Sequence, residues 1–162
     1  MPEIRNPRPA GPHHQVVEVH ATTRAGAYRR EPCEECPWRK DAPVGAFPAE
    51  AYRHSARTAF DSAQEKFSCH MSGTDKPQAC AGFLLSNSAN NLAVRLAAAR
   101  GQIDLSKVSA RDHQLYRSYR EMAIANGVPA DDPAIAPCRG DDESWLPVQQ
   151  RIRTTTPGSD QE

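Results

Sequence analysis

The sequence predicts a mainly α fold: a small three-helix domain with an irregular, metal-stapled cysteine loop and flexible termini. Apolar residues recur at helical spacing in three segments, and prolines crowd the N-terminus and the stretch before the first of these segments. Four cysteines fall into two groups that bracket the first expected helix. Only 38% of the 162 residues are hydrophobic, so a bound metal would help to stabilise a modest core.

The N-terminal part is expected to contain little regular structure. Four prolines and Gly11 within residues 1–15 predict a disordered segment. The β-prone run Val16–Ala21 predicts one edge strand. Residues 24–48 hold four more prolines and predict a long loop, which needs something to order it inside a compact domain. We therefore expect a single metal-binding domain over residues 16–146.

The first helix is expected to begin near Pro48, because proline suits the first helical turn. Its buried face follows the i, i+4, i+7 spacing and would consist of Tyr52, Ala56, Ala59, Phe60, Ala63 and Phe67. A helix of this length would deliver Cys69 and His70 at its C-terminal end. The apolar run Gly82–Leu85 predicts at most a helical turn.

Two further helices complete the expected domain. Residues 90–100 place Leu92, Leu96 and Ala99 on one face, and Gly101 is a suitable stop. The third helix is expected to start at Ser109 as N-cap and to end at Asn126-Gly127, with a buried stripe of Leu115, Tyr119, Met122 and Ala123. Trp145-Leu146 is expected to pack on the core, and residues 147–162 to form a flexible tail.

Cysteines carry the clearest chemical signal. Cys33 and Cys36 form a Cys-x-x-Cys pair, and Cys69 and Cys80 supply two more thiols. Two cysteines at that spacing can reach one centre from a single tight turn, and thiolates are soft ligands that favour zinc and iron–sulfur clusters. The four residues are therefore the expected metal ligands. Cys138 shows no partner spacing and is expected to be a free thiol.

The sequence leaves two alternatives for the identity of the metal. The ten-residue gap between Cys69 and Cys80 departs from the close pairs common in structural zinc sites. Cys36-Pro37 is similar to the Cys-Pro step of bacterial ferredoxins, and nearby aromatic residues would limit solvent access to a cluster. These features favour a [4Fe–4S] cluster slightly, with Zn as the alternative.

Three neighbours are expected to support the ligands without binding the metal: His70, Trp38 and Arg39. Adjacent residues usually point apart, so His70 and Cys69 would not both bind one ion. A cationic histidine would suit the end of the first helix. Trp38 and Arg39 follow the Cys-x-x-Cys pair directly.

Most other functions are disfavoured. The chain lacks His-Glu-x-x-His, a Gly-x-Ser-x-Gly elbow and a glycine-rich phosphate loop, so an enzyme is not the first expectation. The net charge is zero, which disfavours nucleic-acid binding, although residues 95–120 carry +4 and lie downstream of Arg39-Lys40. No run reaches the ~18 apolar residues of a membrane span, and no secretion signal is evident. A cytoplasmic location with reduced thiols is expected.

Several blocks together resemble a family of small uncharacterised proteins of actinobacteria and their phages. The blocks are Cys33–Arg39 (Cys-Glu-Glu-Cys-Pro-Trp-Arg), Phe47-Pro48, Cys69-His70, Cys80–Leu84 and Asn91–Leu96. The likeness covers about residues 30–127 and implies that the four cysteines belong together. The chain also resembles the cluster-bearing WhiB-like regulators in being a small protein with four such cysteines, but the cysteine spacings differ, so the similarity does not extend to the sequence motif.

Two functions are expected from these observations. The first is a small metalloprotein whose [4Fe–4S] cluster senses redox state or transfers electrons through an unknown protein partner. The alternative is a zinc-stapled module that binds a protein or a nucleic acid without redox chemistry.

Overall fold

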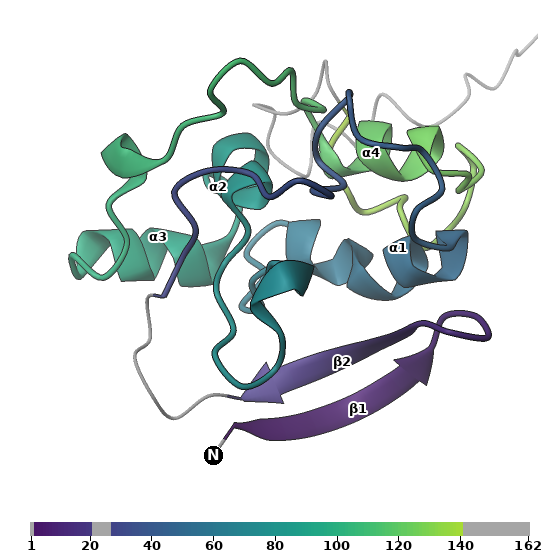
Figure 1. The fold of residues 1–162 in the computed structure, drawn as a ribbon, viewed down its shortest axis with the longest axis horizontal. Helices are drawn as coiled ribbons and strands as arrows, with labels where there is room; N and C mark the ends of the chain where they lie inside the picture. The colour runs from purple at the N-terminus through teal and green to yellow at the C-terminus, as the bar shows by residue number, and fades with distance from the viewer. Residues whose placement is uncertain (1, 21–26, 141–162) are drawn as a thin grey trace, which may run out of the picture.

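The computed structural model describes residues 2–20 and 27–140. It contains an antiparallel hairpin of β1 (Glu3–Pro9) and β2 (Gln15–His20) and four short helices: α1 (Ala49–Ser55), α2 (Ala81–Asn87), α3 (Leu92–Ala99) and α4 (Tyr119–Ala125). Single 3₁₀ turns lie at Ala56–Ala59, His70–Ser72 and Leu105–Lys107. In Figure 1 the hairpin runs along one side of α1 and α4 lies on the other side, whereas α3 lies level with α1 and α2 lies above α3.

The expected mainly α, three-helix fold is therefore wrong: the protein has a mixed fold of four short helices and a two-stranded sheet. Residues 3–9, expected to be disordered, form β1. Prolines are tolerated there because both strands are edges, and the register shifts between Arg5 and Arg8, where Asn6 has a φ of +47°. The strand expected near residues 16–21 is confirmed as β2. Residues 145–162, for which docking and a flexible tail were expected, lie outside the described residues.

The first helix begins where expected, after Pro48, but it is much shorter than the apolar spacing suggested. The 3₁₀ turn that follows α1 ends at Ala59, because Phe60 adopts an extended backbone (φ −70°, ψ 152°) and Ser62 has a φ of +62°. Cys69 therefore does not lie at a helix end. It follows an extended segment that pairs with the residues before Cys80.

The last helix begins at Ser118 rather than at Ser109. Residues 114–116 instead pair with the cysteine loop: Lys40 N donates to Gln114 O at 2.8 Å, and Tyr116 N donates to Trp38 O at 2.9 Å. The Ser118 side chain caps α4 by accepting from Glu121 N. The buried residues Tyr119, Met122 and Ala123 and the stop near Gly127 are as expected.

Helix α3 also occurs as predicted, with Gly101 at a φ of +69° after its end, but its buried face differs. Val94 and Ala97 face the core, whereas Leu96 is 43% exposed. Buried Asn91 fixes this orientation, since its side chain accepts from Val94 N and donates to the carbonyls of Thr58 and Glu65.

The core centres on Trp38, which is fully buried next to the cysteine loop. Its ring centroid lies 5.8–6.2 Å from those of Phe67, Phe83 and Tyr119. None of the helices in residues 2–20 and 27–140 is long and apolar enough to cross a bilayer.

Candidate metal centre

A tight turn brings Cys33 and Cys36 together. Cys36 N donates to Cys33 O at 3.2 Å, and Arg39 N donates to Cys36 O at 3.0 Å. The Arg39 guanidinium donates from Nη1 to the carbonyls of Cys33 (3.1 Å) and Glu34 (3.0 Å), and its other two nitrogens bind the Asp41 carboxylate. Arg39 thus clamps the turn from outside and contributes no ligand.

Antiparallel pairing brings Cys69 and Cys80 together. Cys69 N donates to Gln78 O at 2.8 Å, and Cys80 N donates to Phe67 O at 2.9 Å. The ten residues between the two cysteines form a loop that closes on itself, with Ser72 Oγ bound to Cys69 O. This pairing explains how cysteines so far apart in sequence can face one centre.

The thiols of both halves approach one another in the interior. Cys36 Sγ lies 3.6 Å from Cys80 Sγ, and the ligand atoms of Cys33, Cys69 and His70 all lie within 4.8 Å of one another. The four cysteines expected as ligands are at most 6% exposed. The structure thus places all four cysteines in one buried core, as two close groups: Cys36 with Cys80, and Cys33 with Cys69 and His70.

Cys138 lies apart from this group. It is 1% exposed, and its sulfur faces the carbonyl oxygen of Ala56 at 3.6 Å. The segment before it is packed rather than loose, because Ile135 is fully buried. Cys138 is therefore a core residue.

The surroundings shift the pKa values of Cys33, Cys36 and Cys80 in different directions. Burial, followed by repulsion from Cys69 and Cys36, raises the pKa of Cys33 to about 12. The Cys36 pKa is lowered to about 7, first by the hydrogen bond from the Cys80 thiol and then by the backbone N–H groups of Trp38 and Gly82. The same Cys36–Cys80 contact, together with burial, raises the pKa of Cys80. The cluster thus supports one thiolate readily and further thiolates only with a compensating cation.

Backbone N–H groups surround the sulfurs. Those of Trp38 and Gly82 reach Cys36, that of Glu35 reaches Cys33, and that of Phe83 reaches Cys80. Such donors favour the thiolate over the thiol, as metal ligation requires. The donor set therefore fits a soft metal ion.

Gly82 packs directly against the cysteine turn, a role that the sequence did not indicate. A Cβ there would lie 2.4 Å from Trp38 Cβ and 3.1 Å from Cys36 Sγ. Only glycine allows α2 to pack this closely against the cysteine turn. The sequence signal was present in Cys80-Ala81-Gly82, but its meaning depends on contact with residues more than forty positions away.

His70 lies nearer the thiols than adjacency to Cys69 suggested, because a 3₁₀ turn starts at this residue. Its side chain is 29% exposed, with Nε2 3.4 Å from a Glu35 carboxylate oxygen. Its ring packs edge-on against Phe47 at a centroid distance of 4.9 Å. His70 is thus placed either to ligate or to support the cluster. Trp38 seals the cluster from the core side, and its Nε1 has no hydrogen-bond partner among the described residues.

Comparison with known proteins places the chain in a family but gives no activity. No curated protein and no solved structure matches it. The model of the "Family of unknown function (DUF6283)" matches residues 28–139, which include all four clustered cysteines and Gly82. The chain therefore belongs to this family of unknown function.

Proposed function

We propose that the protein is a zinc-stapled interaction module in which Cys33, Cys36, Cys69 and Cys80 bind one Zn²⁺. The observation that carries this proposal is the 3.6 Å between Cys36 Sγ and Cys80 Sγ. Two thiolates on one tetrahedral zinc, each with a bond of about 2.3 Å, lie about 3.8 Å apart. The second pair, Cys33 and Cys69, lies close by with its sulfurs within 4.8 Å.

A [4Fe–4S] cluster requires larger distances between the cysteine sulfurs, because each thiolate then binds a different iron at a corner of the cubane. The contact between Cys36 and Cys80 is short for that geometry. The cluster, with redox sensing or electron transfer, remains a prediction from the sequence, and zinc is the better-supported choice.

A zinc ion here would hold together segments that have little other regular structure. It would join the Cys33–Arg39 turn to the paired segments that carry Cys69 and Cys80, and it would compensate the charge of the buried thiolates. The expected function is therefore to present a rigid surface to a partner rather than to catalyse a reaction.

A protein is the preferred partner over a nucleic acid. The basic residues that suggested a nucleic-acid surface are in part neutralised: Arg39 binds Asp41, Lys40 binds Glu121, and Arg111 binds Glu31. Phosphate binding needs cations that are not already paired. We further propose a cytoplasmic location, because thiols stay reduced there. We also propose that the chain groups with the Cys-x-x-Cys-Pro-Trp-Arg proteins of actinobacteria and their phages.

The test is a series of single Cys→Ser variants with zinc content as the readout. Each of the substitutions at Cys33, Cys36, Cys69 and Cys80 should lower the bound zinc well below one ion per chain. Cys138→Ser is the matched control, because it is an equally buried cysteine outside the cluster. Loss of zinc in the Cys138 variant with retention in a quartet variant would disprove the ligand set. If His70 replaces one thiolate as ligand, His70→Ala would lose zinc and one quartet variant would keep it.

A further inference from the structure

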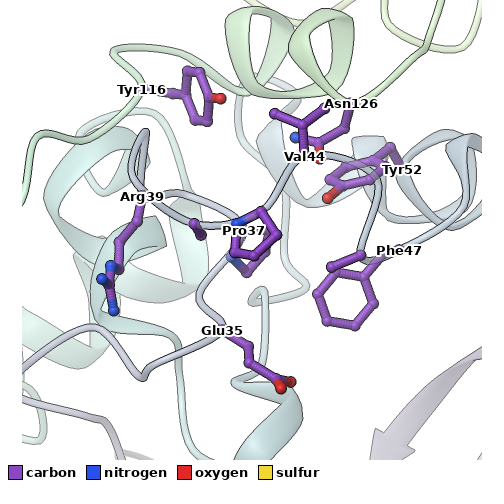
Figure 2. Close-up of a pocket in the computed structure, with 11 residues that line it drawn as sticks. Glu35, Pro37, Arg39, Val44, Phe47, Tyr52, Tyr116 and Asn126 are labelled. Atoms are coloured by element: carbon purple, nitrogen blue, oxygen red, sulfur yellow. The ribbon is translucent and has the colours of Figure 1, made fainter.

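A small pocket of about 70 Å³ lies beside the Cys-x-x-Cys turn (Figure 2). One wall is the segment 35–47, and the others are Tyr52 of α1, Tyr116 and the α4 cap residue Asn126. Most of the lining is apolar: Pro37, Ala42, Pro43, Val44, Ala46 and Phe47. A single water needs only ~10–15 Å³, so the pocket has room for several heavy atoms.

Tyr52 supplies an unused polar group in this pocket. Its side chain is 3% exposed, and its hydroxyl has no hydrogen-bond partner among the described residues. Figure 2 shows the hydroxyl directed toward Pro37. Burial raises the pKa of Tyr52, so the group stays protonated and can donate. Buried polar groups are normally paired, and this one therefore points to a ligand with an acceptor.

The charges around the pocket favour a neutral ligand. Arg39 is occupied by the Asp41 carboxylate and by the carbonyls of Cys33 and Glu34. The other charged lining residue is Glu35, whose carboxylate is 66% exposed and would repel an anion. An uncharged carbonyl oxygen is the acceptor that fits both the Tyr52 hydroxyl and these charges.

The apolar lining continues outward onto the surface. Val44 is 62% exposed and extends the pocket into a rim. The rim is held in place by Asn126, whose Oδ1 accepts from Gly45 N at 3.1 Å and whose Nδ2 donates to Met122 O. A ligand that fills the pocket would thus also cover apolar surface outside it, as a peptide does and an isolated small amide does not.

We propose that this pocket binds a peptide segment of a partner protein. The segment inserts one prolyl or small aliphatic side chain, and one of its backbone carbonyls accepts a hydrogen bond from the Tyr52 hydroxyl. The partner then lies directly against the Cys33–Arg39 turn. This inference goes beyond the metal centre and holds whichever metal the cysteines bind.

Saturation-transfer NMR tests the proposal on the full-length protein as purified, with its metal. The probes are N-acetyl-L-valinamide and N-acetyl-L-prolinamide, compared with isobutyramide and with isovalerate, which replaces the neutral carbonyl with a carboxylate. Binding near the millimolar range is expected for probes of this size. At least one capped residue should bind, and both small comparison compounds should bind about tenfold more weakly or not at all.

Two variants localise the binding. Tyr52→Phe should lower the affinity for the probe by about three- to tenfold, as the loss of one hydrogen bond does. It should not lower the melting temperature, because the Tyr52 hydroxyl has no hydrogen-bond partner among the described residues. Ala46→Leu, at an exposed position in the pocket lining, should lower the affinity for the probe because the larger side chain fills the pocket. The proposal is overturned if neither capped residue binds, if Tyr52→Phe and Ala46→Leu leave binding unchanged, or if isobutyramide or isovalerate binds as well as the capped residues.

Discussion

At the scale of single residues, Gly82 decides how closely α2 approaches the cysteine turn. Gly82→Ala should destabilise the protein by about 3 kcal/mol, because the new methyl meets Trp38 Cβ and Cγ, which cannot move away without shifting the turn. This cost exceeds the roughly 1 kcal/mol that alanine gains over glycine in a helix. Denaturant unfolding measures the difference. Leu85→Ala on the exposed side of α2 is the control and should cost far less; an equal or smaller loss for Gly82→Ala would contradict the packing described here.

The thiol acidities give a pH dependence for metal binding. Zinc binds thiolates, and the raised pKa values of Cys33 (about 12) and Cys80 mean that these two thiols are protonated near neutral pH without a bound ion. Binding therefore releases protons, so affinity increases with pH and falls as the pH drops. Competition with a chromophoric chelator should show an apparent affinity at least about a hundredfold lower near pH 6 than near pH 8. A pH-independent affinity, after correction for the chelator, would argue against thiolate ligands.

The sequence indicated which cysteines lie close together, because ligand spacing constrains them, but it did not indicate positions that depend on packing; the ligand role of the four cysteines stays a prediction. Cys33 and Cys36 had to share a turn, and the approach of Cys69 and Cys80 followed from the need to complete a four-ligand set. The positions of His70 and Cys138 could not be predicted in this way. The first depends on a local 3₁₀ turn, and the second on burial against Ala56.

At the scale of elements, buried Asn91 holds α3 to the rest of the fold. Asn91→Ala should cost about 2–4 kcal/mol, because it removes an N-cap and leaves the carbonyls of Thr58 and Glu65 without their donors. Ser118→Ala removes the cap of α4 and should cost about 1 kcal/mol. Thermal or urea unfolding compares the two. Equal losses would mean that Asn91 acts as a cap alone.

The two helix caps also show why element boundaries were only partly predictable. Ser109 and Ser118 are both plausible starts, but only Ser118 has a glutamate three residues later, and the carboxylate of this Glu121 accepts a hydrogen bond from Arg117 N. Residues 114–116 pair with the cysteine loop instead of forming a helical turn. Likewise the apolar spacing of residues 52–67 continues past Ala59 although the helix does not, because Phe60, Ala63 and Phe67 pack in or against the core from turns and irregular segments.

At the scale of the whole molecule, we expect the hairpin to be separable from the proposed metal centre. It contacts the α1 region through the ion pair of Glu18 with Arg57, through His54 Nε2 at 3.1 Å from Pro9 O, and through the rings of His14 and Phe47. The match of the family model to this chain begins at residue 28, after the hairpin. Deletion of residues 2–20 should therefore leave zinc content unchanged, with only a modest drop in melting temperature. Loss of the metal on deletion would show that the hairpin is part of the centre.

The fold class was mispredicted because short elements leave weak periodic signals. Helices of seven or eight residues span only two turns, and a hairpin containing Pro7 and Pro9 has the composition of a disordered segment. Long-range pairing around the cysteines, which no local pattern encodes, sets the architecture instead. The metal that the modest apolar content and the cysteine spacing led us to expect stays a prediction.

The most direct test of the central claim is to quantify zinc, iron and acid-labile sulfide in protein purified without oxygen, with an absorption spectrum of the same sample. The account predicts one zinc per chain, no sulfide and a colourless protein, because the Cys36–Cys80 separation of 3.6 Å suits a single ion. A brown protein with about four irons and four sulfides per chain would contradict the single-ion centre and establish the cluster instead.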